Sequence, residues 1–448
     1  FVTDLPARAK LLKMKQHGGS HACCFCLNSG KHLLNRYCYP LLDALDNKLR
    51  TKSHVSKCYK DSALSGQPVF GIKGEPLFTQ LPLWSMTRCT TIDSMHLIHG
   101  VFKKLIDVWT KPLISNRSCR FKSQKAKPIV SKRKWSQFNR DLVSQKLPQI
   151  FHRKMRSIEQ HGAYYKAIEA YLFVTTMYPL LKRVLPDRYY SHHMLLVSGL
   201  KVLLGRSISM EQLDQAELDL IRYVLEFPLL YGKHNVSLNI HNIAHLGRSV
   251  RLHGPLWTST CFHYESFNHT LLKSIVGTYR VERGMGSCID KLQWVIRKVR
   301  QCTDQRMVSC LQKMGCRFLH GGKGVSVGRN VYAYSKLGPK SCRESGISQY
   351  KRLSVNGVWI DALDFVKQRS FDNSLVRLLD GTICKVKKVI HNTRTNSWNM
   401  VVQYLSHGQL SKEGVRPVLD INELVIGIQE QNTYICYEDL SCVKLFLL

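Results

Sequence analysis

The spacing of the hydrophobic residues changes along this chain, and that change limits the folds that the chain can adopt. From about Trp135 to Tyr231 they recur at the period of an amphipathic helix. The clearest helix begins after Ser209, where Ser-Met-Glu-Gln forms a capping box, and we expect Pro228 to end it. A further helix is expected over residues 289–311. The predicted core positions of the helix after Ser209 are Leu213, Ala216, Leu220, Val224 and Phe227.

After about Arg317 the pattern changes from helix to strand. β-branched and aromatic residues gather in four runs, over residues 325–334, 350–360, 383–390 and 398–404. Asn356-Gly357 and Asp380-Gly381 are hairpin turn signals between such runs. Residues 317–448 are therefore predicted to form a small, barrel-like β-rich domain.

The first 110 residues mix short apolar runs with Cys, His, Gly and Pro, which indicates strands, loops and a small metal-bound knuckle. Cys23 and Cys26 form a Cys-x-x-Cys pair that could bind zinc. The alternative is that both are free buried thiols. Sixteen cysteines in 448 residues are too sparse for a secreted disulfide scaffold, so a reducing compartment is expected. The remaining zinc ligands are sought among His21, Cys38, His54 and Cys58.

The charge balance is strongly positive. Lys and Arg number 66 against 31 Asp and Glu, a net charge of +35, which predicts attraction to a polyanion such as nucleic acid. Residues 317–448 carry +7 of this charge and the rest of the chain carries +28. Between Lys111 and Arg140 there are ten basic residues and no acidic one, a pattern typical of phosphate contacts or of a solvated loop. The predicted DNA contacts in this segment are Lys122, Lys125, Lys127, Lys132, Arg133 and Lys134.

Three acidic positions could take part in chemistry. Asp4 precedes Leu5-Pro6, where the alternative is a turn or a helix cap. Asp93 and His96 stand three apart at the start of an apolar helix and could point together at a metal or phosphate, although an N-cap with an incidental His gives the same spacing. Glu265 lies in an apolar and aromatic stretch, where burial would require a partner or a metal; the alternative is exposure to solvent.

Taken in order, four stretches resemble the CACTA (EnSpm) type of DNA transposase, in its animal branch. They are DLPARAKLLKMKQHGGSHACCFC from residue 4, GIKGEPLFTQLP from residue 71, IDSMHLIHGVFKKLIDVW from residue 92, and NIHNIAHL with GPLWTSTCFHYESFNHTLLKSIVGT from residue 239. The resemblance covers roughly residues 1–285, and it lies in the co-linear order of the stretches.

The resemblance implies a ribonuclease H-like fold interrupted by a large helical insertion. The expected fold is α/β plus α plus β: a partial ribonuclease H-like core over residues 1–110, a basic helical insertion over 111–250, a glutamate-bearing helical segment over 251–316, and the β-rich domain. Asp4 would be the second catalytic acid, at the end of a central strand, and Glu265 the third. Asp93 and His96 would be the Asp-x-x-His pair, and the first acid would lie upstream of Phe1.

The activity implied is the cutting and joining of DNA by two Mg²⁺ (or Mn²⁺) ions, held by Asp4 and Glu265 among others. DNA is the expected partner, the nucleus the expected location, and a homo-oligomer is compatible with both. The alternative is a catalytically dead, domesticated or decayed protein that still binds DNA or chromatin. No apolar run approaches the roughly 18 residues needed to cross a bilayer, so no membrane association is expected.

Overall fold

The computed structural model describes two compact units. The N-terminal unit comprises residues Phe1–Gln145 and Met155–Cys261, and the C-terminal unit comprises Lys146–Lys154 and Phe262–Leu448. The boundaries of the four predicted domains remain predictions. The described residues are 1–41, 48–112, 127–147, 153–274, 281–301, 325–328, 331–336, 347–355, 358–366, 374–377, 383–392, 394, 397–404, 417–420, 435–436 and 445–446.

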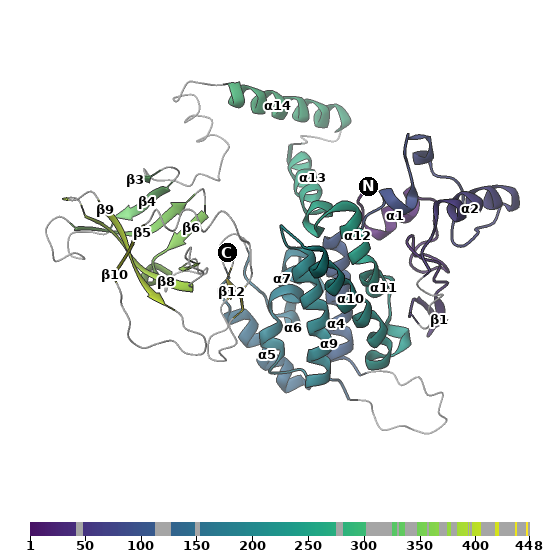
Figure 1. Ribbon diagram of the computed structural model, residues 1–448, viewed down its shortest axis with the longest axis horizontal. Helices are drawn as coiled ribbons and strands as arrows, with labels where there is room; N and C mark the ends of the chain where they lie inside the picture. The colour runs from purple at the N-terminus through teal and green to yellow at the C-terminus, as the bar shows by residue number, and fades with distance from the viewer. Residues whose placement is uncertain are drawn as a thin grey trace. The chain divides into compact units, whose positions relative to one another are not determined.

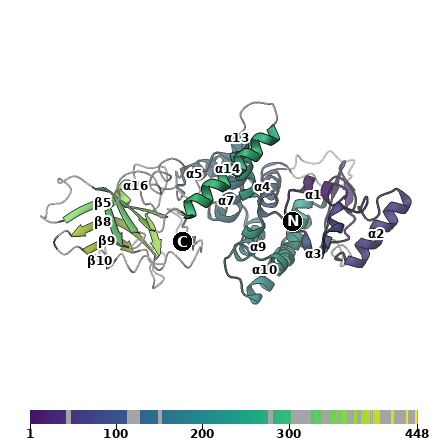
Figure 2. The same cartoon turned by 90° about the horizontal axis from the view of Figure 1, so that it is seen from above.

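Most of the N-terminal unit is helical. Figures 1 and 2 show α4, α7, α9 and α10 packed together in its centre. Its helices are α1 (Leu5–Leu11), α2 (Lys52–Ser65), α3 (Met86–Cys89), α4 (Ser94–Thr110), α5 (Lys132–Ser144), α6 (Ile158–His161), α7 (Ala167–Thr176), α8 (Tyr178–Leu181), α9 (Asp187–Leu203), α10 (Met210–Tyr231), α11 (Leu238–Asn242) and α12 (Leu246–His253). Short 3-10 turns are η2 (Leu77–Gln80), η4 (Gly162–Tyr164), η5 (Lys233–Asn235), η6 (Ile243–His245) and η7 (Leu256–Ser259).

Helix α10 confirms the predicted capping box. The Ser209 side chain accepts from the backbone N–H of Gln212, whose side chain accepts in return from the N–H of Ser209. All five predicted core positions are buried. The predicted end was wrong, because Pro228 lies inside the helix and the chain turns only at Gly232, where φ is 89°. A proline near the C-terminus removes a single hydrogen bond, and glycine tolerates the positive φ at which the helix ends.

Helix α4 positions the short helix α11. Its buried face includes Leu97, Val101 and Leu105, the spacing that places side chains on one side of a helix. Gly100 lies on this helix against Asn239 of α11, and a Cβ at Gly100 would collide with the Asn239 side chain. The absence of a side chain at Gly100 therefore lets the two helices approach closely.

Within the described residues of the N-terminal unit, β1 (Lys31–Leu33) and β2 (Arg36–Cys38) form the only sheet, a small antiparallel hairpin. The protein is a mixture of helix and sheet, as predicted, but these residues show no ribonuclease H-like sheet. Asp4, expected to end a central strand, directly precedes α1 instead. Leu5-Pro6 explains the difference, because proline is favoured in the first turn of a helix.

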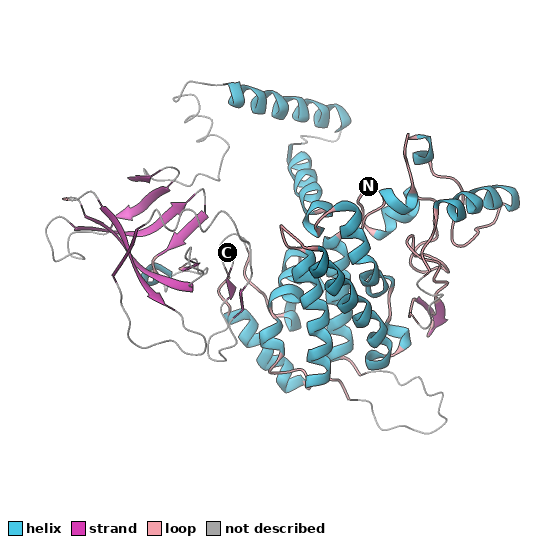
Figure 3. Ribbon diagram, viewed as in Figure 1, coloured by secondary structure: helices cyan, strands magenta, loops and turns pink. Residues whose placement is uncertain are grey.

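The C-terminal unit carries an antiparallel sheet, shown in magenta in Figure 3. The strand order is β10-β9-β8-β5-β4-β3, with β6 paired to β5 and β7 to β8. Val355 pairs with Val358 and Arg377 with Ile383, so the strands flanking both predicted turns are paired, although the turn residues lie outside the described part. The elements of the unit are α13 (Phe262–Ser274), α14 (Val281–Gln301), α16 (Leu363–Val366), β3 (Val325–Gly328), β4 (Val331–Lys336), β5 (Ile347–Val355), β6 (Val358–Asp361), β7 (Leu375–Arg377), β8 (Ile383–Asn392), β9 (Ser397–Tyr404), β10 (Pro417–Asp420), β11 (Ile435–Cys436) and β12 (Leu445–Phe446).

The helix predicted over residues 289–311 begins earlier, as α14, and residues 302–311 lie outside the described part. Among the described residues, no helix combines the length and the apolar character that crossing a membrane requires.

Candidate metal centre and acidic site

Two cysteines and two histidines meet in the core of the N-terminal unit. Cys23 and Cys26 come from the loop after α1, whereas His241 lies on α11 and His245 ends η6. All four side chains are buried, and their nitrogen and sulfur atoms all lie within 4.8 Å of one another. The predicted Cys-x-x-Cys pair therefore gains two histidine partners from more than 200 residues away.

The spacing of the four ligand atoms fits a single zinc ion. Cys26 Sγ lies 3.2 Å from His241 Nε2, Cys23 Sγ lies 3.5 Å from His245 Nε2, and the two Nε2 atoms are 3.2 Å apart. Zinc bonds of about 2.3 Å to sulfur and about 2.0 Å to nitrogen, arranged as a tetrahedron, separate neighbouring ligand atoms by roughly 3.3–3.8 Å. The observed separations are close to this range, and two thiolates with two imidazoles are a common zinc ligand set.

A hydrogen bond fixes the orientation of one histidine. Nδ1 of His241 lies 3.1 Å from the carbonyl oxygen of Tyr39, so this nitrogen donates and Nε2 carries the lone pair that faces the cysteines. Carbonyl partners of this kind orient metal-binding histidines in proteins. His241 is therefore held in the tautomer that a metal needs.

Arg50 holds the cysteine loop around the site by hydrogen bonds, a role that the sequence did not predict. Its Nε donates to the carbonyl oxygens of Cys23 and Cys26, both at 3.0 Å, and Nη2 donates to those of His21 and Phe70. Arg50 is only 2% exposed. One buried guanidinium thus satisfies four loop carbonyls, which would otherwise be costly to bury.

The four ligands sought close to the cysteine pair do not join the cluster. Cys38 donates to the carbonyl of His234, His54 and Cys58 contact each other on α2, and His21 packs its ring against Phe70. The missed ligands carried a signal, since His241 and His245 are four residues apart, the spacing that places two side chains on one helical face.

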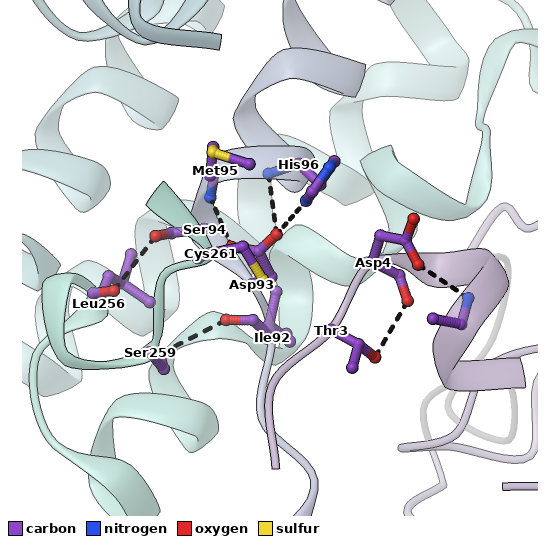
Figure 4. A network of polar contacts seen from close by, with 11 residues as sticks. Thr3, Asp4, Ile92, Asp93, Ser94, Met95, His96, Leu256, Ser259 and Cys261 are labelled. Atoms are coloured by element: carbon purple, nitrogen blue, oxygen red, sulfur yellow. Dashed lines mark hydrogen bonds and ion pairs between the residues drawn. The ribbon is translucent and has the colours of Figure 1, made fainter. Parts of the chain in front are cut away.

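Asp93 and Cys261, which are buried, form a second group with the partly exposed His96. Asp93 is the N-cap of α4: Oδ1 accepts from the N–H groups of Met95 and Cys261, and Oδ2 accepts from the N–H of His96 and contacts its Nδ1 (Figure 4). Burial alone would raise the pKa of Asp93, but the hydrogen bonds from His96 and from the backbone of Cys261 lower it below its ordinary value. Asp93 is therefore an ionised cap whose acceptor positions face protein donors.

Among the described residues, this group of potential ligands contains neither of the other two predicted acids. Asp4 caps α1, with Oδ1 accepting from the N–H of Ala7 at 2.8 Å, and Figure 4 shows its carboxylate turned to that helix. Glu265 lies in the first turn of α13, in the C-terminal unit. Among the described residues, no metal-ligand group contains two carboxylates, whereas Mg²⁺ prefers several oxygen ligands. The described residues therefore fit a metal such as zinc, and they give no support for the expected Mg²⁺ pair.

Replacing Asp93 with Ala should destabilise the protein more than replacing Asp4 with Ala. Asp4 is a half-buried cap whose carboxylate accepts a hydrogen bond from the N–H of Ala7, and losing such a cap costs about 1 kcal/mol. Asp93→Ala leaves three N–H donors without an acceptor in the core, which we expect to cost about 3 kcal/mol. Chemical denaturation of the two variants measures the difference. Equal losses would contradict the assignment of Asp93 as the more deeply engaged cap.

The predicted DNA-contacting residues divide between described and undescribed parts. Lys122 and Lys125 lie outside the described residues. Lys127 is exposed before α5, and Lys132, Arg133 and Lys134 are exposed in its first turn. That turn holds no acidic residue, although the helix dipole favours anions there.

Comparisons of the chain with protein-family models, with curated proteins and with solved structures found no match. Its function therefore has to be inferred from its own residues.

Proposed function

We propose that this protein binds DNA, that it is related to the CACTA-type DNA transposases, and that a structural zinc ion holds its N-terminal unit together. The observation that carries the proposal is the convergence of the family-like stretches. Cys23 and Cys26 of the first stretch meet His241 and His245 of the fourth. Asp93 and His96 of the third meet Cys261, also of the fourth. Stretches recognised by their order alone thus supply the residues of two clusters.

The charge of the chain supports DNA as the partner. Outside residues 317–448 the net charge is +28, and three cations stand at the start of α5, where they oppose the helix dipole. The three positive charges in that turn destabilise helix α5 because they repel one another and oppose the helix dipole. A polyanion bound there would interact favourably with all three. Nuclear localisation follows from a DNA partner, and a homo-oligomer is compatible with it.

Catalysis is the part of the proposal that rests on the family resemblance. A ribonuclease H-like active site would use Asp4, Glu265 and a further acid to hold Mg²⁺ or Mn²⁺ for phosphoryl transfer. The second candidate is a DNA-binding protein without nuclease activity. Asp4 and Asp93 both serve as helix caps, and this observation favours the second candidate.

Binding to duplex DNA should show little sequence preference and a steep dependence on salt. If three cations each neutralise one phosphate, the affinity falls about 40-fold between roughly 50 and 200 mM salt. Fluorescence anisotropy with two unrelated duplexes measures both properties. An affinity that stays constant over this range would contradict the proposal.

The double variant Arg133→Ala/Lys134→Ala locates the contact. Its expected effect is a loss of about 1.8 from the slope of log affinity against log salt, equal on both duplexes. The matched control is Lys182→Ala/Arg183→Ala, which removes an exposed Lys and Arg elsewhere in the same unit and should leave the slope unchanged. Equal slopes for the two variants would mean that the start of α5 is only solvated.

A further inference from the structure

A cation in the N-terminal unit is buried with no acidic partner. Arg8 of α1 is only 5% exposed. Its Nη1 lies 3.7 Å from the thiol of Cys24, its guanidinium lies over the ring of Phe25, and its Nε has no hydrogen-bond partner. No ion pair of Arg8 occurs among the described residues. Burying a charge without an ionic partner is unfavourable, so an anion bound beside Arg8 would stabilise this arrangement.

Arg8 lines a pocket that could admit one. The pocket lies beside α1 and the cysteine loop and opens to solvent. Lys15 and His17 also line it, and none of its lining residues is Asp or Glu. Lys15 is half-buried and donates to Ser20, and His17 is exposed, so these two groups are more accessible to solvent than Arg8.

Residues next to the candidate zinc ligands build part of the same pocket. Cys24 lies between the two cysteine ligands, and Asn242 lies between the two histidine ligands; both line the pocket. Asn242 Oδ1 is also within 3.9 Å of Cys23 Sγ. The loop that would hold zinc therefore also places the groups around Arg8.

We propose that this pocket binds a phosphate group, with Arg8 as its buried ligand and Lys15 and His17 at its mouth. A guanidinium is suited to a phosphate because its planar N–H groups match the phosphate oxygens. The phosphate can belong to the DNA backbone or to inorganic phosphate. The site does not depend on the DNA-binding function proposed above, since free phosphate alone would occupy it.

The experiment is a titration of the full-length protein, saturated with zinc, with inorganic phosphate at constant ionic strength, followed by calorimetry and ³¹P NMR. Saturable binding is expected for the wild type, and Arg8→Met should weaken it about tenfold or more, because a charge-assisted contact is lost. Lys10→Met is the matched control, since Lys10 is exposed on the same helix and does not line the pocket. It should bind phosphate as the wild type does.

Thermal melting gives an independent readout. Without phosphate, Arg8→Met should melt at or above the wild-type temperature, because it removes an unpaired buried charge. Phosphate should raise the melting temperature of the wild type more than that of the variant. If Arg8→Met does not fold, Lys15→Met tests the same pocket from a half-buried position and should also weaken binding.

Competition identifies the source of the phosphate. Displacement of bound phosphate by a short duplex means that the pocket takes a backbone phosphate, whereas undisturbed binding means that it takes the free ion; both outcomes support the site. The proposal is overturned if the wild type shows no saturable phosphate binding, or if wild type, Arg8→Met and Lys15→Met bind phosphate equally. Loss of DNA binding by Arg133→Ala/Lys134→Ala with phosphate binding intact would separate this site from the DNA contact.

Discussion

Cys26→Ser is expected to abolish zinc binding and to destabilise the N-terminal unit strongly. The free energy of zinc binding to a structural site is about 10 kcal/mol or more, comparable with the whole stability of a typical domain. The cluster joins a loop near the start of the chain to α11 and η6, and without the metal it leaves two buried thiols and two buried imidazoles facing one another. We therefore expect the melting temperature to fall by about 10 °C or more.

Metal analysis and melting curves with and without a chelator measure this effect. The matched control is Cys58→Ser, because Cys58 is also buried and also contacts a histidine, but lies outside the cluster. The control should retain one zinc per chain and a near-normal melting temperature. A Cys26→Ser protein that keeps a tightly bound zinc would contradict the assignment, as would a wild-type protein that melts identically with and without chelator.

Acid should destabilise the N-terminal unit well before its carboxylates are protonated. His192 and His193 lie side by side on α9 and are buried. His192 Nε2 is 2.9 Å from the carbonyl oxygen of Tyr223, whereas neither ring nitrogen of His193 has a hydrogen-bond partner among the described residues. Burial lowers the pKa of His192 to about 4 and that of His193 to about 3.

The direction of this pH dependence follows from the uptake of protons on unfolding. An unfolded histidine titrates near pH 6.5, so below that pH the unfolded chain binds protons that the folded chain excludes. The stability from the two neutral rings is fully present above about pH 6.5 and is lost as the pH falls towards 4. Each ring contributes about 1.4 kcal/mol per pH unit, so between pH 6.5 and 5 the pair lowers the free energy of unfolding by about 4 kcal/mol.

The variant His193→Leu separates the effect of one histidine ring from the effect of zinc loss in acid. With zinc in excess, the difference in free energy of unfolding between His193→Leu and the wild type should shift in favour of the variant. The expected shift is about 1.4 kcal/mol for each pH unit below about 6.5. His161→Leu is the control, since His161 is exposed and its ring stays in water in both states. A pH dependence of His193→Leu that matches the wild type would remove His193 as a source of acid sensitivity.

The parts of the fold that the sequence predicts are those determined locally. The capping box at Ser209 and the apolar stripe of α10 act over neighbouring turns, and paired strands flank Asn356-Gly357. Asp4 carried two signals that disagreed: the family resemblance placed it at the end of a strand, whereas the proline two residues later favours a helix N-terminus. The local signal was correct in the described residues.

The candidate site was predicted only in part, because its ligands come from distant segments. The Cys-x-x-Cys pair is visible locally, but the sequence cannot show which histidines fold back onto it, and the nearer candidates His54 and Cys58 pair with each other. Arg50 gives no signal at all, since its role depends on carbonyl groups that only the folded loop brings together.

The separation of the zinc ligands also bears on how the protein is made. His241 follows its partner Cys26 by 215 residues. At about 5–20 residues per second, a ribosome needs roughly 10–40 s to synthesise that interval. During this time a nascent chain displays the two thiols without their histidines, open to oxidation or to capture of the wrong metal. The cluster can therefore form only after α11 has been synthesised.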